Sequence, residues 1–296
     1  MLKIHGDTLN IQRTGKHRCA LPFSLYALEA QTLLPAASHP MTHSGLLEER
    51  RQHVQAFLAC QGASEFISRL HAVFIGGSLA KGTADTLSDT DVCLIVSERH
   101  LIGCLEHLGL PYEHRQYEYR IDTEFPPDNK LDVRLISLES LENMIERFQS
   151  MTDLSASHQD CLANLQEGIY LHSTPEVVEL IRRIDFSYEH ASLIISDKLR
   201  YLKHYNLSKY LIRKDFFTYY EMLGILYAAF CHIFFAINGQ LFRGYRHLQR
   251  FSVRYEIYPS AVISAFSECF ECATPAATDN LLIQLSGFTQ ALEEHL

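Results

Sequence analysis

The chain of 296 residues is long enough for one large domain or two ordinary ones. Its 47% hydrophobic and 21% charged residues indicate a soluble globular protein and exclude a disordered one. The formal net charge of -9 argues against a nucleic-acid partner held on a broad basic surface. The eight scattered cysteines are typical of free thiols in a reducing compartment, and the pair Cys269 and Cys272 lacks the second ligand pair that a zinc site needs.

Residues 1–45 show no sustained periodicity and contain Pro22, Pro35 and Pro40, so we expect an N-terminal extension there. The first residues lack the apolar core of a secretory signal, which makes the cytoplasm the expected location. From Leu46 onward, apolar residues recur at helical spacing, and regular structure is expected to begin.

Residues 46–173 carry the signals of an α/β domain. Short apolar runs rich in β-branched residues predict buried strands, and helices are expected after the second and third of these strands. The segment from Tyr112 to Phe125 alternates charged and aromatic residues, which predicts an exposed strand that ends in a turn. We expect a small mixed sheet with flanking helices: strands at 71–75, 91–96 and 131–136, helices at 98–108 and 137–148, and the turn at 126–129.

Strand signals stop near residue 174, so we expect an all-α helical-bundle domain over residues 174–296. The apolar stretch from Met222 to Ile237 is shorter than a membrane-spanning helix requires, and we expect a buried helix there. The expected helices of this domain lie at 175–183, 188–205, 215–238, 260–272 and 278–295.

Gly76, Gly77 and Ser78 follow the first predicted strand and form the first part of a candidate site. Glycine allows the backbone to approach a ligand closely, and N–H groups at the start of a helix bind anions. The Ser78 hydroxyl can add a hydrogen bond to the same anion. The segment therefore predicts contacts with phosphate oxygens.

Asp89 and Asp91 lie at the start of the second predicted strand. In an extended chain, residues two apart point to the same face, so both carboxylates converge and Thr90 points away. A hard divalent ion such as Mg²⁺ relieves their repulsion, because it prefers oxygen ligands and bridges protein carboxylates to substrate phosphates. Asp132 lies on the third strand, where strand pairing can place it beside them. Three carboxylates around two metal ions suit an in-line displacement at phosphorus.

Other interpretations of this segment fit less well. Thr83 follows Gly82 where a Walker P-loop requires a lysine. Asp89-Thr-Asp91 leads into an apolar strand without the glycine of an EF-hand loop. Taken alone, Asp89 is typical of a turn or a cap. The order strand, Gly-Gly-Ser, acidic pair and second strand favours a catalytic site instead.

In this order, the residues resemble the DNA polymerase β-type nucleotidyltransferase superfamily, and most closely its aminoglycoside/lincosamide-type (minimal) members. The signature of that family is a strand, Gly-Ser, about ten residues and Asp-x-Asp before a second strand, and Gly77-Ser78 with Asp89-Thr-Asp91 match it with ten residues between. Ala80-Lys81-Gly82 resembles the small-basic-glycine step of antibiotic nucleotidyltransferases, and Ser88 before the first aspartate is also typical. The resemblance implies Asp132 as the third acid, with Asp122 as the alternative.

The resemblance extends more weakly to the rest of the chain. Gly168–Ser173 resembles the short strand after the catalytic domain, and the helical half resembles a substrate-binding domain. Arg246 stands near the position of a lysine that approaches the nucleotide phosphates in such enzymes. Arginine keeps the charge, but a planar fork differs from a point charge, and a solvated arginine is the alternative.

The function that the resemblance implies is transfer of AMP from ATP to a hydroxyl of a small, aminoglycoside-like acceptor, with two Mg²⁺ ions and release of pyrophosphate. The general base stays open between Asp132, Glu142 and Glu146. The alternatives are transfer of AMP to a protein or RNA and a non-catalytic nucleotide sensor. No nucleic-acid partner and no membrane partner is expected. The expected catalytic and metal-binding residues are Asp89, Asp91 and Asp132, and the expected nucleotide-binding residues are Gly76, Gly77, Ser78, Lys81, Ser88 and Arg246.

Overall fold

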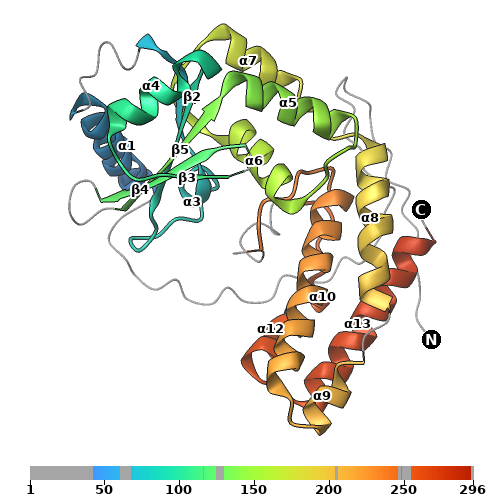
Figure 1. Ribbon diagram of the computed structural model, residues 1–296. Helices are drawn as coiled ribbons and strands as arrows, with labels where there is room; N and C mark the ends of the chain where they lie inside the picture. Colours follow the sequence, from blue (N-terminus) through green and yellow to red (C-terminus); the bar gives the residue numbers. More distant parts are fainter. Residues whose placement is uncertain are drawn as a thin grey trace. The chain divides into compact units, whose positions relative to one another are not determined.

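The computed structural model describes residues 43–60, 68–115, 117–124, 130–203, 206–245, 248 and 255–294. The described chain divides into two compact units after Asp185, an α/β unit and a helical unit (Figure 1). Residues 1–42 of the expected N-terminal extension, the expected turn at 126–129 and Arg246 lie outside the described residues.

The α/β unit contains a six-stranded mixed sheet in the order β3-β4-β5-β2-β1-β6. β2 and β5 are parallel, and the other neighbouring strands pair antiparallel. The mixed sheet and its three central strands were predicted from the apolar runs, and the structure confirms them. The strands are β1 (Leu70–Ile75), β2 (Thr90–Val96), β3 (Glu113–His114), β4 (Tyr119–Glu124), β5 (Lys130–Ser137) and β6 (Ile169–Ser173).

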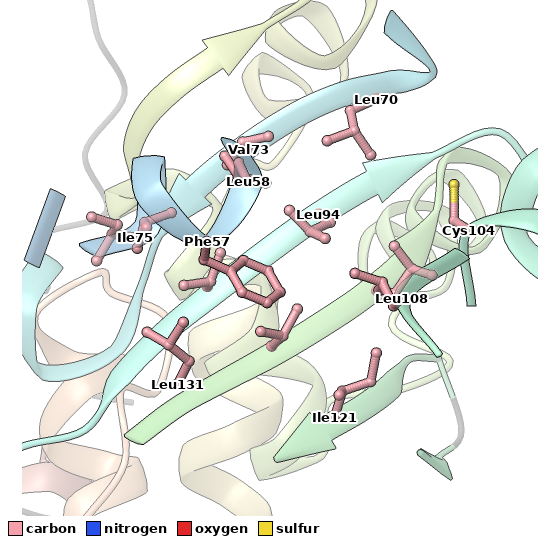
Figure 2. Packing of buried hydrophobic residues seen from close by; sticks show 14 of the residues in the cluster. Phe57, Leu58, Leu70, Val73, Ile75, Leu94, Cys104, Leu108, Ile121 and Leu131 are labelled. Atoms are coloured by element: carbon pink, nitrogen blue, oxygen red, sulfur yellow. The ribbon is translucent and has the colours of Figure 1, made fainter. Parts of the chain in front are cut away.

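One face of the sheet is almost entirely apolar, with the buried Thr90 as a polar residue among the apolar ones. Alternate residues of the central strands, such as Val73, Leu94 and Leu131, point to this face and are buried. Phe57 from α1 (His43–Cys60) and Leu108 from α4 (Glu98–Leu108) pack against them (Figure 2). The opposite face also buries apolar residues such as Phe74 and Ile95, and it carries the acidic side chains at one end.

The opposite face carries Asp91 and Asp132 and lies under α5 (Leu138–Gln149) and α6 (Ala156–Glu167). The Ser137 hydroxyl accepts a hydrogen bond from Ser140 N at 3.0 Å and caps α5. Near the site, α6 also packs on α3 (Gly77–Ala80). α5 and α6 therefore cover the face of the sheet that carries Asp91 and Asp132.

The α/β unit extends past residue 173, where the sequence placed its end. α7 (Pro175–Arg182) packs on α5 and β1, and Glu176 lies 3.3 Å from His71 Nδ1. Arg183 then pairs with Glu142 at 3.1 Å. Strand signals end before α7, but α7 contacts β1 and α5 of the α/β unit. The domain boundary expected from the sequence therefore lies before this helix and the observed one after it.

In the described part of the helical unit, α10 packs against α8 and α9, and α13 packs against α8, α9 and α12. The Tyr219 hydroxyl lies 3.0 Å from Thr278 Oγ1, which fixes α10 against α13. Every cysteine in the described part of the chain is free. The helices are α8 (Tyr188–Lys203), α9 (Ser208–Ile212), α10 (Phe216–Ile237), α12 (Ser260–Glu271) and α13 (Pro275–Glu293).

α10 is longer than the apolar stretch that the sequence indicated. It begins at Phe216 and has 22 residues, so by length and composition alone it could cross a membrane. Core helices of soluble proteins pass the same test, and 61% of its most apolar window is buried inside the structure. The burial agrees with the expected core helix, and its bounds lie within one residue of the helix expected at 215–238.

His232 on α10 is expected to make the stability of the helical unit depend on pH. Burial and the nearby Lys198 lower its pKa to about 4, against a smaller opposing effect of Asp197, and its ring stacks on Phe242 at 4.1 Å. The unfolded chain then binds the proton more tightly than the folded chain. The contribution of His232 to the free energy of unfolding is therefore fully present above about pH 6.5. It falls by up to about 3 kcal/mol as the pH drops to about 4.

Urea unfolding at neutral and at acidic pH checks this expectation. The variant His232→Phe should lose this part of the pH dependence, because it keeps the stacked ring and removes the titrating group. Equal pH dependence in the variant and the natural protein would contradict it.

Candidate functional site

Asp91 and Asp132 stand opposite each other on the parallel strands β2 and β5. Register partners share a face of the sheet, so the structure brings these two predicted residues together. The side chain of Asp132 is 3% exposed and that of Asp91 is 18% exposed. Asp89 precedes β2, is partly buried and lies near enough for its charge to act on Asp91. Asp122, the alternative third acid, is the register partner of Asp132 on β4.

Two arginines that the sequence interpretation missed hold these carboxylates. Arg134 Nη2 lies 3.0 Å from Asp91 Oδ1 and 3.6 Å from Asp132 Oδ2. Arg120 Nη2, on the adjacent strand β4, lies 2.9 Å from Asp132 Oδ2. Arg134 follows Asp132 by two residues on one strand and therefore shares its face. This spacing was the signal in the sequence that could have found Arg134.

The charges around Asp91 oppose one another. Burial raises the pKa of Asp91, Arg134 lowers it, and the charges of Asp132 and Asp89 raise it further; the net direction is upward. Burial lowers the pKa of Arg134, but Glu118, Asp91 and Asp132 together hold it well above its ordinary value. Arg134 is therefore permanently charged and partly neutralises the carboxylates around it.

The carboxylate pair has the oxygen donor atoms that a hard cation prefers. Asp132 Oδ1 is buried and has no hydrogen-bond partner, which leaves a carboxylate oxygen available to a ligand. Within the described residues, no group of three or more His, Cys, Asp or Glu side chains is placed to hold a metal ion. The predicted arrangement of three carboxylates around two ions is thus not assembled here, and further ligands would have to come from a substrate or from water.

Gly77 sits directly against Asp91. Its φ is +58°, and a Cβ atom at this position would lie 1.7 Å from Asp91 Oδ2. Only glycine fits both the backbone conformation and the space. Gly77 N donates to Asn164 Oδ1 at 3.1 Å, and Gly76 N donates to the Asp91 carbonyl at 2.9 Å. Both glycine N–H groups expected to meet phosphate are therefore engaged within the protein.

Lys81 also has a partner within the protein. Its Nζ lies 3.0 Å from Asp160 Oδ1, and Asp160 Oδ2 accepts a hydrogen bond from Asn164 Nδ2 at 3.3 Å. These contacts, with the bond from Gly77 N to Asn164, tie both ends of α3 to one face of α6. Asp160 and Asn164 were missed by sequence interpretation, and their four-residue spacing on a helix was the one available signal. The predicted contact of Lys81 with a nucleotide stays a prediction.

The two predicted serines occupy different environments. Ser78 is half-buried in α3, and its carbonyl accepts hydrogen bonds from Thr83 N and Ala84 N at 2.9 and 3.1 Å. Ser88 Oγ donates to Asp85 Oδ1 and accepts from Asp85 N, both at 3.0 Å. Ser88 therefore stabilises the turn that precedes Asp89. This structural role does not depend on a bound nucleotide.

Asp91, Arg134, Asn164 and the two glycines line a pocket in the α/β unit, whereas Asp132 and Ser78 are not among its lining residues. Glu118 also lines this pocket, although the sequence interpretation did not single it out. Its carboxylate lies 4.0 Å from Arg134 Nη1. Glu142 and Glu146, the helix glutamates considered as a base, are half-exposed or more, pair with Arg183 and do not line this pocket. The pocket has charged groups and an apolar wall; it is lined by Phe74, Gly76, Gly77, Asp91, Val92, Cys93, Glu118, Arg134, Ile136, Cys161, Asn164 and Leu165.

The two thiols in the pocket are not reactive nucleophiles at neutral pH. Burial raises the pKa of Cys161 to about 12 and raises that of Cys93 well above its ordinary value. A thiol attacks and binds metals as the thiolate, which neither group forms near pH 7. The chemistry of the pocket therefore rests on its carboxylates and arginine.

No protein-family model matches the sequence, and the comparison with curated proteins gives no match. Among solved structures, the chain is similar to a nucleotidyltransferase-like protein from Exiguobacterium sibiricum, whose crystal structure was determined at 1.90 Å resolution. The two share 9% identity with a TM-score of 0.40, over 82% of this chain and 75% of the other. A likeness this remote carries no argument about function, which has to rest on the site itself.

Proposed function

We propose that the chain is a nucleotidyltransferase that moves AMP from ATP to a hydroxyl group and releases pyrophosphate. The observation that carries the proposal is the register of Asp91 and Asp132 on adjacent parallel strands, against the turn of Gly77 and Ser78. In-line transfer at phosphorus needs little covalent help from a protein; it needs positioned charge and oxygen ligands for a metal ion. Asp91, Glu118 and Arg134 supply charged groups in one pocket, and Asp132 stands beside Asp91 on the adjacent strand.

Asp91 and Asp132 would hold a Mg²⁺ ion, with triphosphate oxygens as its remaining ligands. When bound, such an ion supplies Lewis-acid polarisation of the α-phosphate and neutralises developing charge. The Ser78 hydroxyl would donate a hydrogen bond to a phosphate oxygen. Asp89 precedes the strand and adds negative charge beside the pair, and a second ion at Asp89 belongs to the same proposal.

Glu118 is our candidate for the group that accepts the proton of the attacking hydroxyl. Its side chain is 15% exposed, lines the pocket with Asp91 and contacts Arg134 at 4.0 Å. The oxygen of the acceptor would form its bond to the α-phosphorus, its proton would pass to a carboxylate, and pyrophosphate would leave. Asp132 is the alternative base, but the two guanidinium groups on its Oδ2 atom disfavour its protonation.

Replacing Arg134 with glutamine is expected to weaken folding and to reduce the Mg²⁺ concentration needed for ATP binding. The change removes the cation that contacts Asp91, Asp132 and Glu118, so three partly buried carboxylates lose a counter-charge. Loss of such a partner costs roughly 3 kcal/mol without metal, and Mg²⁺ should recover part of it.

Thermal unfolding with and without Mg²⁺ and ATP measures both effects. The matched control is Arg183→Gln, which removes ion pairs of the same kind from the exposed surface of α5. If Mg²⁺ stabilised Arg134→Gln no more than the control, the competition between Arg134 and a metal ion would be refuted.

The acceptor that fits best is a small cationic molecule with hydroxyl groups, such as an aminoglycoside. The net charge of -9 and the carboxylates of the pocket favour a cation. Transfer of AMP to a protein or to RNA is the alternative acceptor class. Binding of the acceptor by the helical unit, including Arg246, is part of the same proposal.

A non-catalytic nucleotide-binding module is the second candidate, because Arg134 and Arg120 already neutralise the carboxylates. Pyrophosphate release from ATP, measured with Mg²⁺ and a panel of aminoglycosides, lincosamides, proteins and RNA, separates the two. The enzyme requires release that depends on both Mg²⁺ and an acceptor. ATP binding without release for any acceptor would favour the module.

A further inference from the structure

The corner between α9 and α10 exposes an unusual run of apolar side chains. Residues 212–217 are all exposed, and the side chains of Ile212, Phe216 and Phe217 are 78%, 51% and 84% accessible. Tyr220, one turn further along α10, is also exposed. Single exposed apolar residues are ordinary, but three large ones within six positions form a contiguous apolar corner.

The same corner carries a local excess of positive charge. Lys209, Arg213 and Lys214 are exposed beside the apolar side chains. Lys214 has φ of 58°, so the chain turns sharply where the basic residues meet the aromatic ones. The acidic residue of the corner, Asp215, uses its carboxylate to accept a hydrogen bond from Thr218 N at 3.2 Å. A basic corner on a chain with net charge -9 points to a negatively charged partner.

The rest of α10 does not share this exposure. On the other face of the helix, residues such as Tyr219, Leu223 and Leu226 are buried against the other helices of the unit. The corner lies at one end of the helical unit, where α9 meets the start of α10 (Figure 1). The available surface is therefore a projecting end, and the helix behind it stays in the core instead of spanning a membrane.

We propose that this corner, defined by residues 209–217 with Tyr220, docks on the surface of an anionic lipid bilayer. Ile212, Phe216 and Phe217 would enter the boundary between headgroups and acyl chains, while Lys209, Arg213 and Lys214 contact lipid phosphates and carboxylates. Ile212 offers no ring for base stacking, and a projecting end lacks the basic groove along which a single nucleic-acid strand runs. A bilayer surface is the anionic partner that accommodates both the aliphatic side chain and the shape.

The absence of tryptophan from the chain makes the first test direct. Phe217→Trp places a single indole at the apolar corner, and its fluorescence should shift to shorter wavelength on addition of vesicles that contain phosphatidylserine. The control Ile102→Trp places the indole at an exposed position on α4, where no shift is expected. A shift equal to that of the control, or none, would overturn the proposal.

Vesicle co-sedimentation of the full chain is the second test. Binding should require phosphatidylserine in phosphatidylcholine vesicles and weaken at high salt. Ile212→Ser with Phe217→Ser should reduce affinity at least about tenfold, and Arg213→Ser with Lys214→Ser roughly fivefold for each charge. Ile102→Ser should bind like the natural protein.

Three outcomes would refute the membrane as partner. One is equal binding to vesicles without phosphatidylserine, and another is unchanged binding by both corner variants. The third is a loss of self-association or of RNA binding in the corner variants without any loss of vesicle binding. Nucleotidyl transfer is expected to be unchanged in every corner variant. A failure of the membrane proposal would therefore leave the proposed activity of the pocket intact.

Discussion

Replacing Asp91 with asparagine is expected to reduce nucleotidyl transfer by at least about a thousandfold while the chain stays folded. The change removes a metal-binding carboxylate and leaves the side-chain volume almost the same. Losing several kcal/mol of stabilisation for the transition state corresponds to a factor of this size. Because burial already raises the pKa of Asp91, the neutral amide should fit the site at little cost in folding. Turnover and thermal unfolding of the same preparation measure the two effects.

Asp197→Asn is the matched control for this variant. Asp197 lies on α8 in the helical unit, pairs with Lys198 and Arg200 and is not part of the pocket. Its replacement is expected to leave turnover within about twofold, as is usual for a surface ion pair of small energetic weight. A fully active Asp91→Asn enzyme would remove the carboxylate pair from the mechanism.

Replacing Gly77 with alanine is expected to lower the free energy of unfolding by at least about 3 kcal/mol and to abolish activity. Alanine at φ +58° is strained by about 1–2 kcal/mol, and its methyl group would lie 1.7 Å from Asp91 Oδ2, so β2 or α3 has to move. Such movement also displaces Asp91 from Asp132. The melting temperature should fall by roughly 10 °C.

The neighbouring glycine supplies the control. A Cβ atom at Gly76 would meet its nearest atoms at 3.7 Å or more, an ordinary contact, and its φ is -108°. Gly76→Ala should therefore cost much less than Gly77→Ala. In an Asp91→Ala background, Gly77→Ala should lose part of its effect, because the clashing oxygen is gone. Equal destabilisation by the two glycine variants would contradict the close contact between Gly77 and Asp91.

The central strands were predictable from the sequence, and the resemblance proposed Asp132 as the partner of Asp91, with Asp122 as the alternative. Their apolar alternation fixes which residues face the core, and residues two apart then share the polar face. A carboxylate next to a buried strand, after Gly77 and Ser78, is a local pattern that needs no knowledge of tertiary contacts. The sequence pattern was most informative where the periodicity of a strand and the chemistry of the site residues point to the same location.

The partners of these residues were not predictable in the same way. Arg120 reaches Asp132 through the pairing of β4 with β5, and Asn164 reaches Gly77 N from a helix 87 positions away. Such contacts depend on how elements pack, which periodicity does not report. The same limit explains why α7 was assigned to the helical half, although it packs on β1 and α5.

The arginine contacts change the physical picture of the site. The sequence suggested three mutually repelling carboxylates that need metal ions to coexist. The structure instead supplies Arg134 as an internal counter-charge and leaves one buried oxygen of Asp132 without a partner. A metal ion bound with a nucleotide would therefore compete with a guanidinium for Asp91, which predicts that metal binding is weak without nucleotide and strengthened by it.

The most direct test of nucleotidyl transfer follows the two ends of the triphosphate separately. ATP labelled at the α-phosphate and ATP labelled at the γ-phosphate are each incubated with the protein, Mg²⁺ and an acceptor that supports pyrophosphate release. The account predicts that the α label becomes attached to the acceptor, the γ label leaves in pyrophosphate, and both events disappear in Asp91→Asn. Transfer of the γ label to the acceptor, or α-label transfer that persists in Asp91→Asn, would contradict it.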